Sequence, residues 1–209
     1  MKIIEPSARI ISEFNGEEVL KLLEMAGRTA YKSEDRVTSD SARAFIAGII
    51  KSGHESVIEH FNISVRVVCD RGVSHEIVRH RLGSFTQEST RYVNYGSARF
   101  GSEITFIRPC FWQDAPDKTS EWESAMKYCE EKYLSLIKLG AAPQEARSVL
   151  PTSLKTELVW TANLREWRHT LKLRISKKAH PQMRQIMLPL LKEFQSKIPA
   201  VFDDIQAEE

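Results

Sequence analysis

The densest group of chemically active side chains lies in residues 79–92. These fourteen residues include three arginines, a histidine, an amide, a carboxylate and four serine or threonine hydroxyls. A guanidinium presents a planar fork of donors that matches phosphates and other planar anions. The segment therefore predicts a binding site for an anionic, oxygen-rich ligand.

The elements that carry this segment can be predicted from its flanks. We expect a helix over residues 71–82, with Asp70 as its N-cap and Gly83 just beyond its end. Neighbouring residues on a helix point about 100° apart, so the basic residues 79–81 would face different surfaces. We therefore expect a site that is assembled across an interface.

Composition sets the class of protein. The chain has 209 residues, of which 42% are hydrophobic and 28% charged, which predicts a single soluble domain over residues 1–209. A net charge of +2 is too small to indicate a nucleic-acid-binding protein. With no long apolar run or signal peptide, and three cysteines that lack metal-type spacing, we expect a cytoplasmic protein without a membrane segment.

Hydrophobic periodicity predicts an irregular alternation of helices and strands. Strands are expected over residues 1–11 (at a sheet edge), 61–69, 104–107 and 156–162. Further helices are expected over residues 15–26, 42–53, 117–139, 143–150, 164–175 and 181–197. This order favours an α+β fold, and no glycine-rich phosphate loop follows any strand.

Two other polar segments are candidate sites. Residues 53–60 contain two histidines and two glutamates, but His54 and His60 do not share a helix face, so we expect a ligand-facing polar loop and no metal site. In the helix over residues 164–175, the side chains of Arg165, Arg168 and Lys172 are expected on one solvated basic face. Asn163 is expected to cap this helix.

Nucleophilic catalysis by a side chain is not indicated. Ser89 lacks a Gly-x-Ser-x-Gly elbow, and no cysteine stands among basic residues. Chemistry is therefore expected to come from a cofactor.

Several motifs together resemble one family. Arg79-His80-Arg81, seven further residues, then Ser89-Thr90-Arg91-Tyr92, resembles the hallmark of the flavin-dependent thymidylate synthases. Other blocks follow the family's order between about residues 50 and 185; they are Gly53-His54-Glu55-Ser56, Glu59-His60, Ala146-Arg147, Leu150-Pro151, Asn163, Leu173-Arg174 and Ala179-His180-Pro181.

The resemblance implies a fold and a reaction. The fold is a central twisted, mainly antiparallel sheet flanked by helices, assembled as a homotetramer with FAD held between subunits. The reaction is reductive methylation of dUMP to dTMP, with methylenetetrahydrofolate as carbon donor, NADPH as reductant and no cysteine nucleophile. Neither nucleic acid nor a membrane is expected as a partner.

The resemblance also implies roles for individual residues. Arg174 and His54 are expected to be catalytic. The residues expected to bind dUMP are Glu76, Ile77, Val78, Arg79, Gln87, Glu88, Ser89, Thr90, Arg91, Arg147 and Arg174. Those expected to bind FAD are Ser56, Arg79, His80, Arg81, Gln87, Asn163, Leu164, Arg165 and His169.

Two alternatives stay open at this point. A nucleic-acid-binding module would use Arg79, Arg81, Arg91 and the basic helix of residues 165–174 as a phosphate-contacting surface. A flavin-dependent relative that acts on another pyrimidine nucleotide would keep the fold and change the product.

Overall fold

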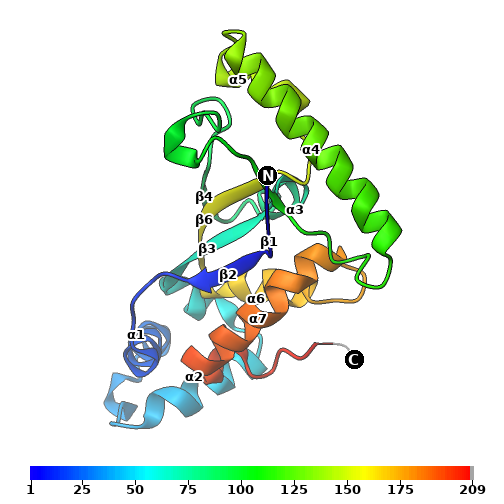
Figure 1. Ribbon diagram of the computed structural model, residues 1–209. Helices are drawn as coiled ribbons and strands as arrows, with labels where there is room; N and C mark the ends of the chain where they lie inside the picture. The colour runs from blue at the N-terminus through cyan, green and yellow to red at the C-terminus, as the bar shows by residue number, and fades with distance from the viewer. Residues whose placement is uncertain (208–209) are drawn as a thin grey trace. The chain divides into compact units, whose positions relative to one another are not determined.

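The computed structural model describes residues 1–207, apart from the side chain of Phe100. Its strands are β1 (Lys2–Ile4), β2 (Ser7–Ile10), β3 (Asn62–Asp70), β4 (Ser84–Gln87), β5 (Thr105–Ile107) and β6 (Lys155–Asn163). Its α-helices are α1 (Gly16–Thr29), α2 (Ser41–Lys51), α3 (Arg71–Ile77), α4 (Pro116–Lys138), α5 (Pro143–Ala146), α6 (Leu164–Arg174), α7 (Pro181–Lys197) and α8 (Pro199–Phe202) (Figure 1). Short 3-10 turns are η1 (Glu34–Arg36), η2 (Glu55–His60), η3 (Ala98–Phe100) and η4 (Arg147–Val149). The class is α+β, as the sequence predicts.

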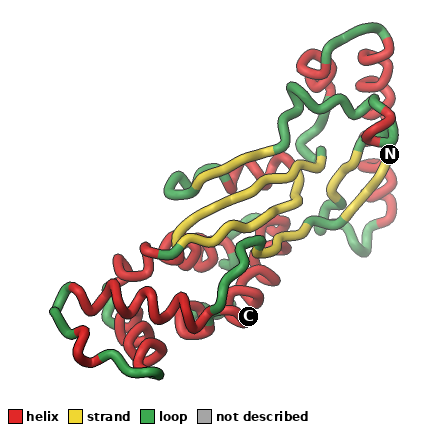
Figure 2. The backbone as a smooth tube through the Cα atoms, turned by 90° about the vertical axis from the view of Figure 1, so that its left-hand side faces the viewer, coloured by secondary structure: helices red, strands yellow, loops and turns green. Residues whose placement is uncertain are grey.

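Two sheets are present in the described residues. A four-stranded antiparallel sheet has the order β2-β3-β6-β4, and β1 pairs with β5 in parallel (strands are yellow in Figure 2). Hydrogen bonds at opposite ends of β3 fix its direction relative to β6: Leu164 donates to the Phe61 carbonyl, and Arg71 donates to the Leu154 carbonyl. The start of β3 therefore lies beside the end of β6.

Alternation of side chains explains the two central strands. In β3 every second residue is buried, including Ile63, Val65 and Val67, and β6 shows the same two-residue period. The strands predicted over residues 61–69 and 156–162 are confirmed.

The chain divides into two compact units. Unit 1 comprises residues 1–7, 67–79 and 86–158, and unit 2 comprises residues 8–66, 80–85 and 159–209. Strands β3, β4 and β6 contribute residues to both units.

Each unit has its own core. In unit 1, helix α4 packs Met126 and Tyr133 against Phe106 and Leu154. In unit 2, helix α6 lies between a strand and helix α7: the Trp167 indole donates to the Ile63 carbonyl at 2.9 Å, and its ring lies 5.2 Å from that of Phe194.

Side-chain caps set the starts of three helices, as the sequence predicts. The Asn15 side chain accepts from the backbone of Glu17 and Glu18, Asp70 accepts from Val73, and Asn163 accepts from Glu166.

The helix predicted over residues 71–82 is too long. Helix α3 ends at Ile77, and residues 79–81 lie in turns, so the argument from helical divergence does not hold for them. The reason is tertiary: the His80 side chain is buried and hydrogen-bonded within unit 2, and these bonds compete with helix continuation. Gly83 is not a helix stop either. It allows close packing, because a Cβ there would lie 2.4 Å from the Trp160 Nε1 atom.

Three smaller differences also have local causes. Pro6, which has no N–H, separates β1 from β2, where a single edge strand was predicted. Strand β4 was not predicted, because its one large apolar residue, Phe85, gives too weak an alternation. The helix predicted over residues 143–150 begins at Pro143 but tightens into η4 from Arg147.

Within residues 1–207, none of the helices is both long and apolar enough to cross a membrane.

Candidate functional site

The predicted ligand residues fall into the two units by ligand. All residues expected to bind dUMP lie in unit 1 except Arg174. All residues expected to bind FAD lie in unit 2 except Arg79 and Gln87. The two sets can therefore be described separately.

Unit 1 contains a cationic pocket of about 290 Å³. Its polar lining includes Arg71, His75, Thr90, Arg147 and Ser148. No carboxylate belongs to this lining among the residues that the structure describes. Two guanidiniums with neighbouring hydroxyls form a suitable donor set for a phosphate.

The contacts of these two arginines leave their charges available. Arg71 Nη1 lies 3.4 Å from the Glu88 carbonyl and 3.5 Å from the Thr156 hydroxyl. Arg147 Nη1 donates to the Thr90 hydroxyl at 3.2 Å. These partners orient the side chains, but they are neutral oxygens and do not compensate a positive charge.

Glu88 is occupied by internal contacts. The Tyr95 hydroxyl donates to one carboxylate oxygen at 2.6 Å, and Lys155 Nζ contacts the other at 3.0 Å. The Glu88 backbone N–H donates to the Glu157 carbonyl. These bonds anchor the start of the loop that carries Thr90, so Glu88 supports the pocket from within the protein.

Gln87 is fixed in the same way at the end of β4. Its Nε2 donates to the Ser74 and Thr156 hydroxyls at 2.9 and 3.1 Å. Both N–H donors of the Gln87 amide are used by these hydroxyls. The side-chain carbonyl oxygen of Gln87 is therefore the part that a ligand can contact.

The remaining predicted dUMP residues differ in exposure. Ser89 Oγ accepts from the Arg91 backbone, and the exposed Arg91 guanidinium lies 5.3 Å from the Tyr92 ring centre. Arg79 is exposed, whereas Glu76 and Val78 are half-buried. Ile77 is fully buried, which leaves only its backbone to a ligand.

Sequence reasoning missed Arg71, His75 and Ser148 as pocket residues. Arg71 and His75 are four residues apart on α3, and this spacing places them on one helix face. That spacing was the available signal. Ser148 follows Arg147 directly, but nothing in its local sequence indicates a ligand.

Unit 2 contains a larger pocket of about 630 Å³. Three residues expected to bind flavin line it: Asn163, Arg165 and His169. Glu55, Glu59 and Glu166 line it as well. The charges of this pocket are therefore mixed, in contrast to those of the unit 1 pocket.

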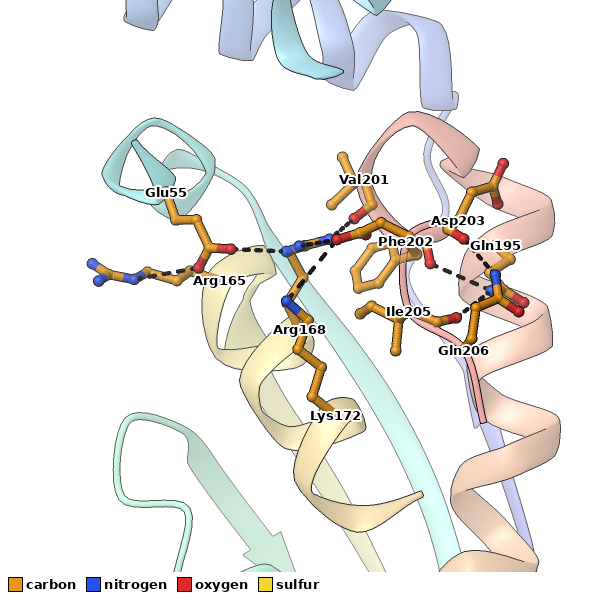
Figure 3. Close-up of polar contacts among 11 residues, drawn as sticks. Glu55, Arg165, Arg168, Lys172, Gln195, Val201, Phe202, Asp203, Ile205 and Gln206 are labelled. Atoms are coloured by element: carbon orange, nitrogen blue, oxygen red, sulfur yellow. Dashed lines mark hydrogen bonds and ion pairs between the residues drawn. The ribbon is translucent and has the colours of Figure 1, made fainter. Parts of the chain in front are cut away.

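The cations of helix α6 are paired with carboxylates. Arg165 Nη1 lies 2.6 Å from Glu59, and the hydrogen bond with Glu59 raises the pKa of Arg165. Arg168 forms a two-pronged contact with Asp204 at 2.6 and 2.7 Å, and it also contacts Glu55 at 3.2 Å. Figure 3 shows this cluster, in which Arg168 also donates to the Val201 carbonyl.

The prediction that Arg168 shares a solvated basic face with Arg165 and Lys172 is wrong. Arg168 is 2% exposed, because its guanidinium is directed inward to Asp204. Burial opposes the charge, but the hydrogen bonds and charge of Asp204 outweigh it and raise the pKa of Arg168. The same contact lowers the pKa of Asp204.

His80 is the centre of a buried polar row. Its Nδ1 lies 3.3 Å from Glu166 Oε1, and its Nε2 accepts from Arg174 Nε at 2.9 Å. Burial and then the charge of Arg174 lower the pKa of His80. Arg174 is half-buried at the end of α6.

The other predicted residues of unit 2 lie on its surface or in its core. His54 and Ser56, at the start of η2, and Arg81 are exposed. Leu164 is fully buried. In the part of the chain that the structure describes, no three His, Cys, Asp or Glu side chains gather as a metal site.

The cysteines have no disulfide partner within residues 1–207. Cys69 is buried, and burial raises the pKa of its thiol. Cys110 is half-buried, and burial raises its pKa too. A raised pKa disfavours the nucleophilic thiolate.

The fold and the two pockets define the class of this protein: an α+β protein with one cationic pocket and a second pocket of mixed charge. Residues 9–200 match the family model described as thymidylate synthase complementing protein, so the chain belongs to this family. The chain is 30% identical over 97% of its length to the flavin-dependent thymidylate synthase of Corynebacterium efficiens, covering 86% of that protein. It is 33% identical over 76% of its length to that of Thermococcus kodakarensis, covering 64% of that protein.

A solved structure shares the fold. The crystal structure of a UMP/dUMP methylase, PolB from Streptomyces cacaoi bound with 5-Br dUMP, matches with a TM-score of 0.77 and 24% identity. The match covers 97% of this chain and 96% of that one.

Proposed function

We propose that the protein is a flavin-dependent thymidylate synthase that converts dUMP to dTMP. Methylenetetrahydrofolate supplies the carbon, NADPH supplies the electrons, and the methylene carbon gains a hydride to become the methyl group. Family membership over residues 9–200 supports this activity and the treatment of both units as one enzyme domain. The single structural observation that carries it is the cationic pocket of unit 1.

The cationic pocket is assigned to the phosphate of dUMP. Arg71 and Arg147 supply charge, and the Thr90 hydroxyl, which accepts from Arg147, has its own proton to donate to the phosphate. Hydrogen bonds to charged groups contribute about 1.5–3 kcal/mol each. A dianionic phosphate beside two uncompensated guanidiniums is therefore the ligand that this pocket favours, with Ser89, Arg91, Gln87 and the backbone of residues 76–79 assigned to the rest of the nucleotide.

The mixed-charge pocket of unit 2 is assigned to the flavin. Its volume of about 630 Å³ suits a cofactor-sized group. Glu55 and Glu59 suit the hydroxyls of a ribityl chain and would repel a diphosphate, so the diphosphate of FAD is assigned to the exposed Arg79 and Arg81. Asn163, Arg165, His169 and the segment at Ser56 and Leu164 complete the set. When bound, the flavin supplies the hydride.

Arg174 is assigned to the uracil ring. A guanidinium at the ring edge stabilises negative charge that develops as the ring carbon becomes nucleophilic. His54, exposed beside the unit 2 pocket residue Glu55, is assigned to folate binding or methylene transfer. The raised pKa values of the Cys69 and Cys110 thiols support a reaction without a cysteine nucleophile.

A homotetramer with shared sites belongs to the same proposal. Leu82 and Tyr92 are 78% and 77% exposed, and each lies within the motif segment of residues 79–92. Large apolar side chains in that position are suited to burial by a neighbouring subunit. Light scattering with and without FAD tests this assembly, and a monomer under both conditions would contradict it.

The activity is tested by an anaerobic assay for dTMP. The full set is protein, FAD, NADPH, dUMP and methylenetetrahydrofolate, and each is omitted in turn. We expect dTMP only when all are present. Product without folate or without FAD, or none with the full set, would overturn the proposal. A parallel arm with UMP decides whether another pyrimidine nucleotide is the better substrate.

The contacts of two arginines disfavour the basic helix of the nucleic-acid-binding alternative. Its basic helix is α6, where Arg168 is buried against Asp204 and Arg165 is paired with Glu59. A helix whose cations are neutralised in this way offers few charges to a phosphate backbone.

A further inference from the structure

Three side chains of unit 2 form a continuous hydrogen-bonded row. Glu166 contacts His80 Nδ1 at 3.3 Å, and Arg174 Nε donates to His80 Nε2 at 2.9 Å. The Thr170 hydroxyl lies 3.2 Å from the same Nδ1. Glu166 and His80 are both buried.

The partners determine which nitrogen of His80 carries the proton. A guanidinium has only donors, so the Nε2 atom that faces Arg174 must be an unprotonated acceptor. The proton of the neutral ring therefore sits on Nδ1, from which it is donated to the Glu166 carboxylate. A carboxylate is an acceptor only, so it selects this tautomer.

We propose that Glu166 is a positioning residue that acts through His80 to hold the guanidinium of Arg174 in one orientation. The Nε–H bond lies in the guanidinium plane, so its capture by His80 fixes the rotation of that plane. The inference rests on the proposed function, in which Arg174 faces the uracil of dUMP.

The surroundings of His80 reinforce this arrangement. Trp160 lies against the ring at 5.4 Å and His169 at 6.2 Å, which restricts rotation of the imidazole. The ionisable groups that face His80 are Glu166, His169 and Arg174. Burial and the charge of Arg174 lower the pKa of His80, which favours the neutral ring, and the bond from Arg174 Nε makes Nε2 its acceptor nitrogen.

Glu166→Gln is the decisive variant because it preserves shape. A glutamine amide can donate as well as accept, so it allows the tautomer with the proton on Nε2. That proton would point at the Nε–H of Arg174 and break the bond. Glu18→Gln, an exposed helical glutamate of the same unit, is the matched control.

The first readout is the tautomer itself in the flavin-loaded protein without nucleotide. Nitrogen chemical shifts of ¹⁵N-labelled histidine are expected to show the Nδ1–H form in the wild-type protein. They are expected to show loss of that form in Glu166→Gln and no change in Glu18→Gln. A wild-type His80 protonated on Nε2 or on both nitrogens would overturn the inference.

The second readout is the anaerobic single-turnover rate at which the reduced flavin is oxidised in the presence of dUMP and methylenetetrahydrofolate. We expect Glu166→Gln to slow it about tenfold, because a misplaced catalytic group lowers the rate; the rates are compared at saturating flavin because Glu166 also lines the pocket assigned to the flavin. In an Arg174→Ala background, the same substitution should have no further effect. An equal slowing in that background would mean a structural role and would overturn the inference, as would a wild-type rate in Glu166→Gln alone.

Failure of the proposed function gives a different pattern. If Arg174→Ala oxidises flavin at the wild-type rate, the assignment of Arg174 to uracil is wrong, although the tautomer can still be as inferred. If Arg174→Ala is slow and Glu166→Gln is not, the proposed function stands and the positioning role fails.

Discussion

Two arginines in each unit are used in opposite ways. In unit 1, Arg71 and Arg147 contact neutral oxygens of Glu88, Thr156 and Thr90. In unit 2, Arg165 and Arg168 contact carboxylates of Glu59, Glu55 and Asp204. Arg71 and Arg147 therefore keep their charges available for an external anion, whereas Arg165 and Arg168 are neutralised by carboxylates within the protein.

This difference indicates which arginines lack a negatively charged partner within the protein and could gain one from a ligand. Hydroxyls and carbonyls orient a guanidinium without neutralising its charge. The full charge of the guanidinium is therefore available to attract a phosphate. A guanidinium already paired with a carboxylate gains less from a ligand and more from holding elements together. Arg71 and Arg147 are thus placed where an anion can approach them, whereas the paired cations of helix α6 hold elements together.

The largest expected effect comes from removing the charges of Arg71 and Arg147 in unit 1. We expect Arg71→Ala with Arg147→Ala to weaken dUMP binding at least a hundredfold, since each charged hydrogen bond contributes about 1.5–3 kcal/mol. Titration calorimetry measures it, with FAD affinity measured alongside. Arg108→Ala, an exposed cation of the same unit paired with Glu5, is the control. A dUMP affinity within twofold of wild type would show that Arg71 and Arg147 are not available to an external anion, and would refute the contrast between the units.

The next effect is on stability in unit 2. Arg168→Ala removes the buried partner of Asp204 and Glu55 and should reduce the free energy of unfolding by about 3 kcal/mol. Denaturant unfolding measures this loss. Lys172→Ala, whose amino group lies 4.0 Å from Asp204 at an exposed position, should change stability far less. Equal effects of the two substitutions would show that burial of the Arg168 pair is unimportant.

A packing change should have a somewhat smaller effect. In Gly83→Ala the new Cβ would lie 2.4 Å from Trp160 Nε1, and overpacking of this kind costs about 1–3 kcal/mol. Thermal unfolding measures it, with Gly48→Ala as the control because a Cβ there meets nothing within 4 Å. A stability of Gly83→Ala equal to that of Gly48→Ala would mean that the Trp160 indole moves freely.

The smallest expected effect is on pH dependence. The pKa of His80 is lowered in the folded protein from its ordinary 6.5, so the unfolded chain binds the proton more tightly. Stability should therefore fall as pH drops below about 6.5 and level off below the folded pKa. His80→Gln should flatten this part of the stability curve relative to wild type. An unchanged curve would mean that His80 keeps an ordinary pKa in the folded protein.

Periodicity in the sequence was sufficient for most of the fold. The two-residue alternation around Val65 and Trp160 specifies the central strands, and the side chains of Asn15 and Asn163 mark helix starts. The early end of α3 was not predictable, because it depends on Glu166 and Arg174, which lie far along the chain from His80.

The sequence motifs name side chains of the candidate site, but they do not indicate which residues contact them. Arg147 and Thr90 were both expected to bind dUMP, yet their contact joins residues 57 positions apart. Arg71 was overlooked because a residue at the start of a helix has an ordinary structural explanation. The burial of Arg168 depends on Asp204, which no local pattern connects to it.

The contacts of Arg168 with Asp204 and the Val201 carbonyl can form only late in synthesis of the chain. Asp204 is made 36 residues after Arg168, and Gln195 of α7 holds the same late segment through the Phe202 and Ile205 carbonyls (Figure 3). On the ribosome, Arg168 therefore has Glu55 as a carboxylate partner before Asp204 emerges. The contacts that hold the middle of helix α6 are therefore expected to be complete only after residue 204 has been made.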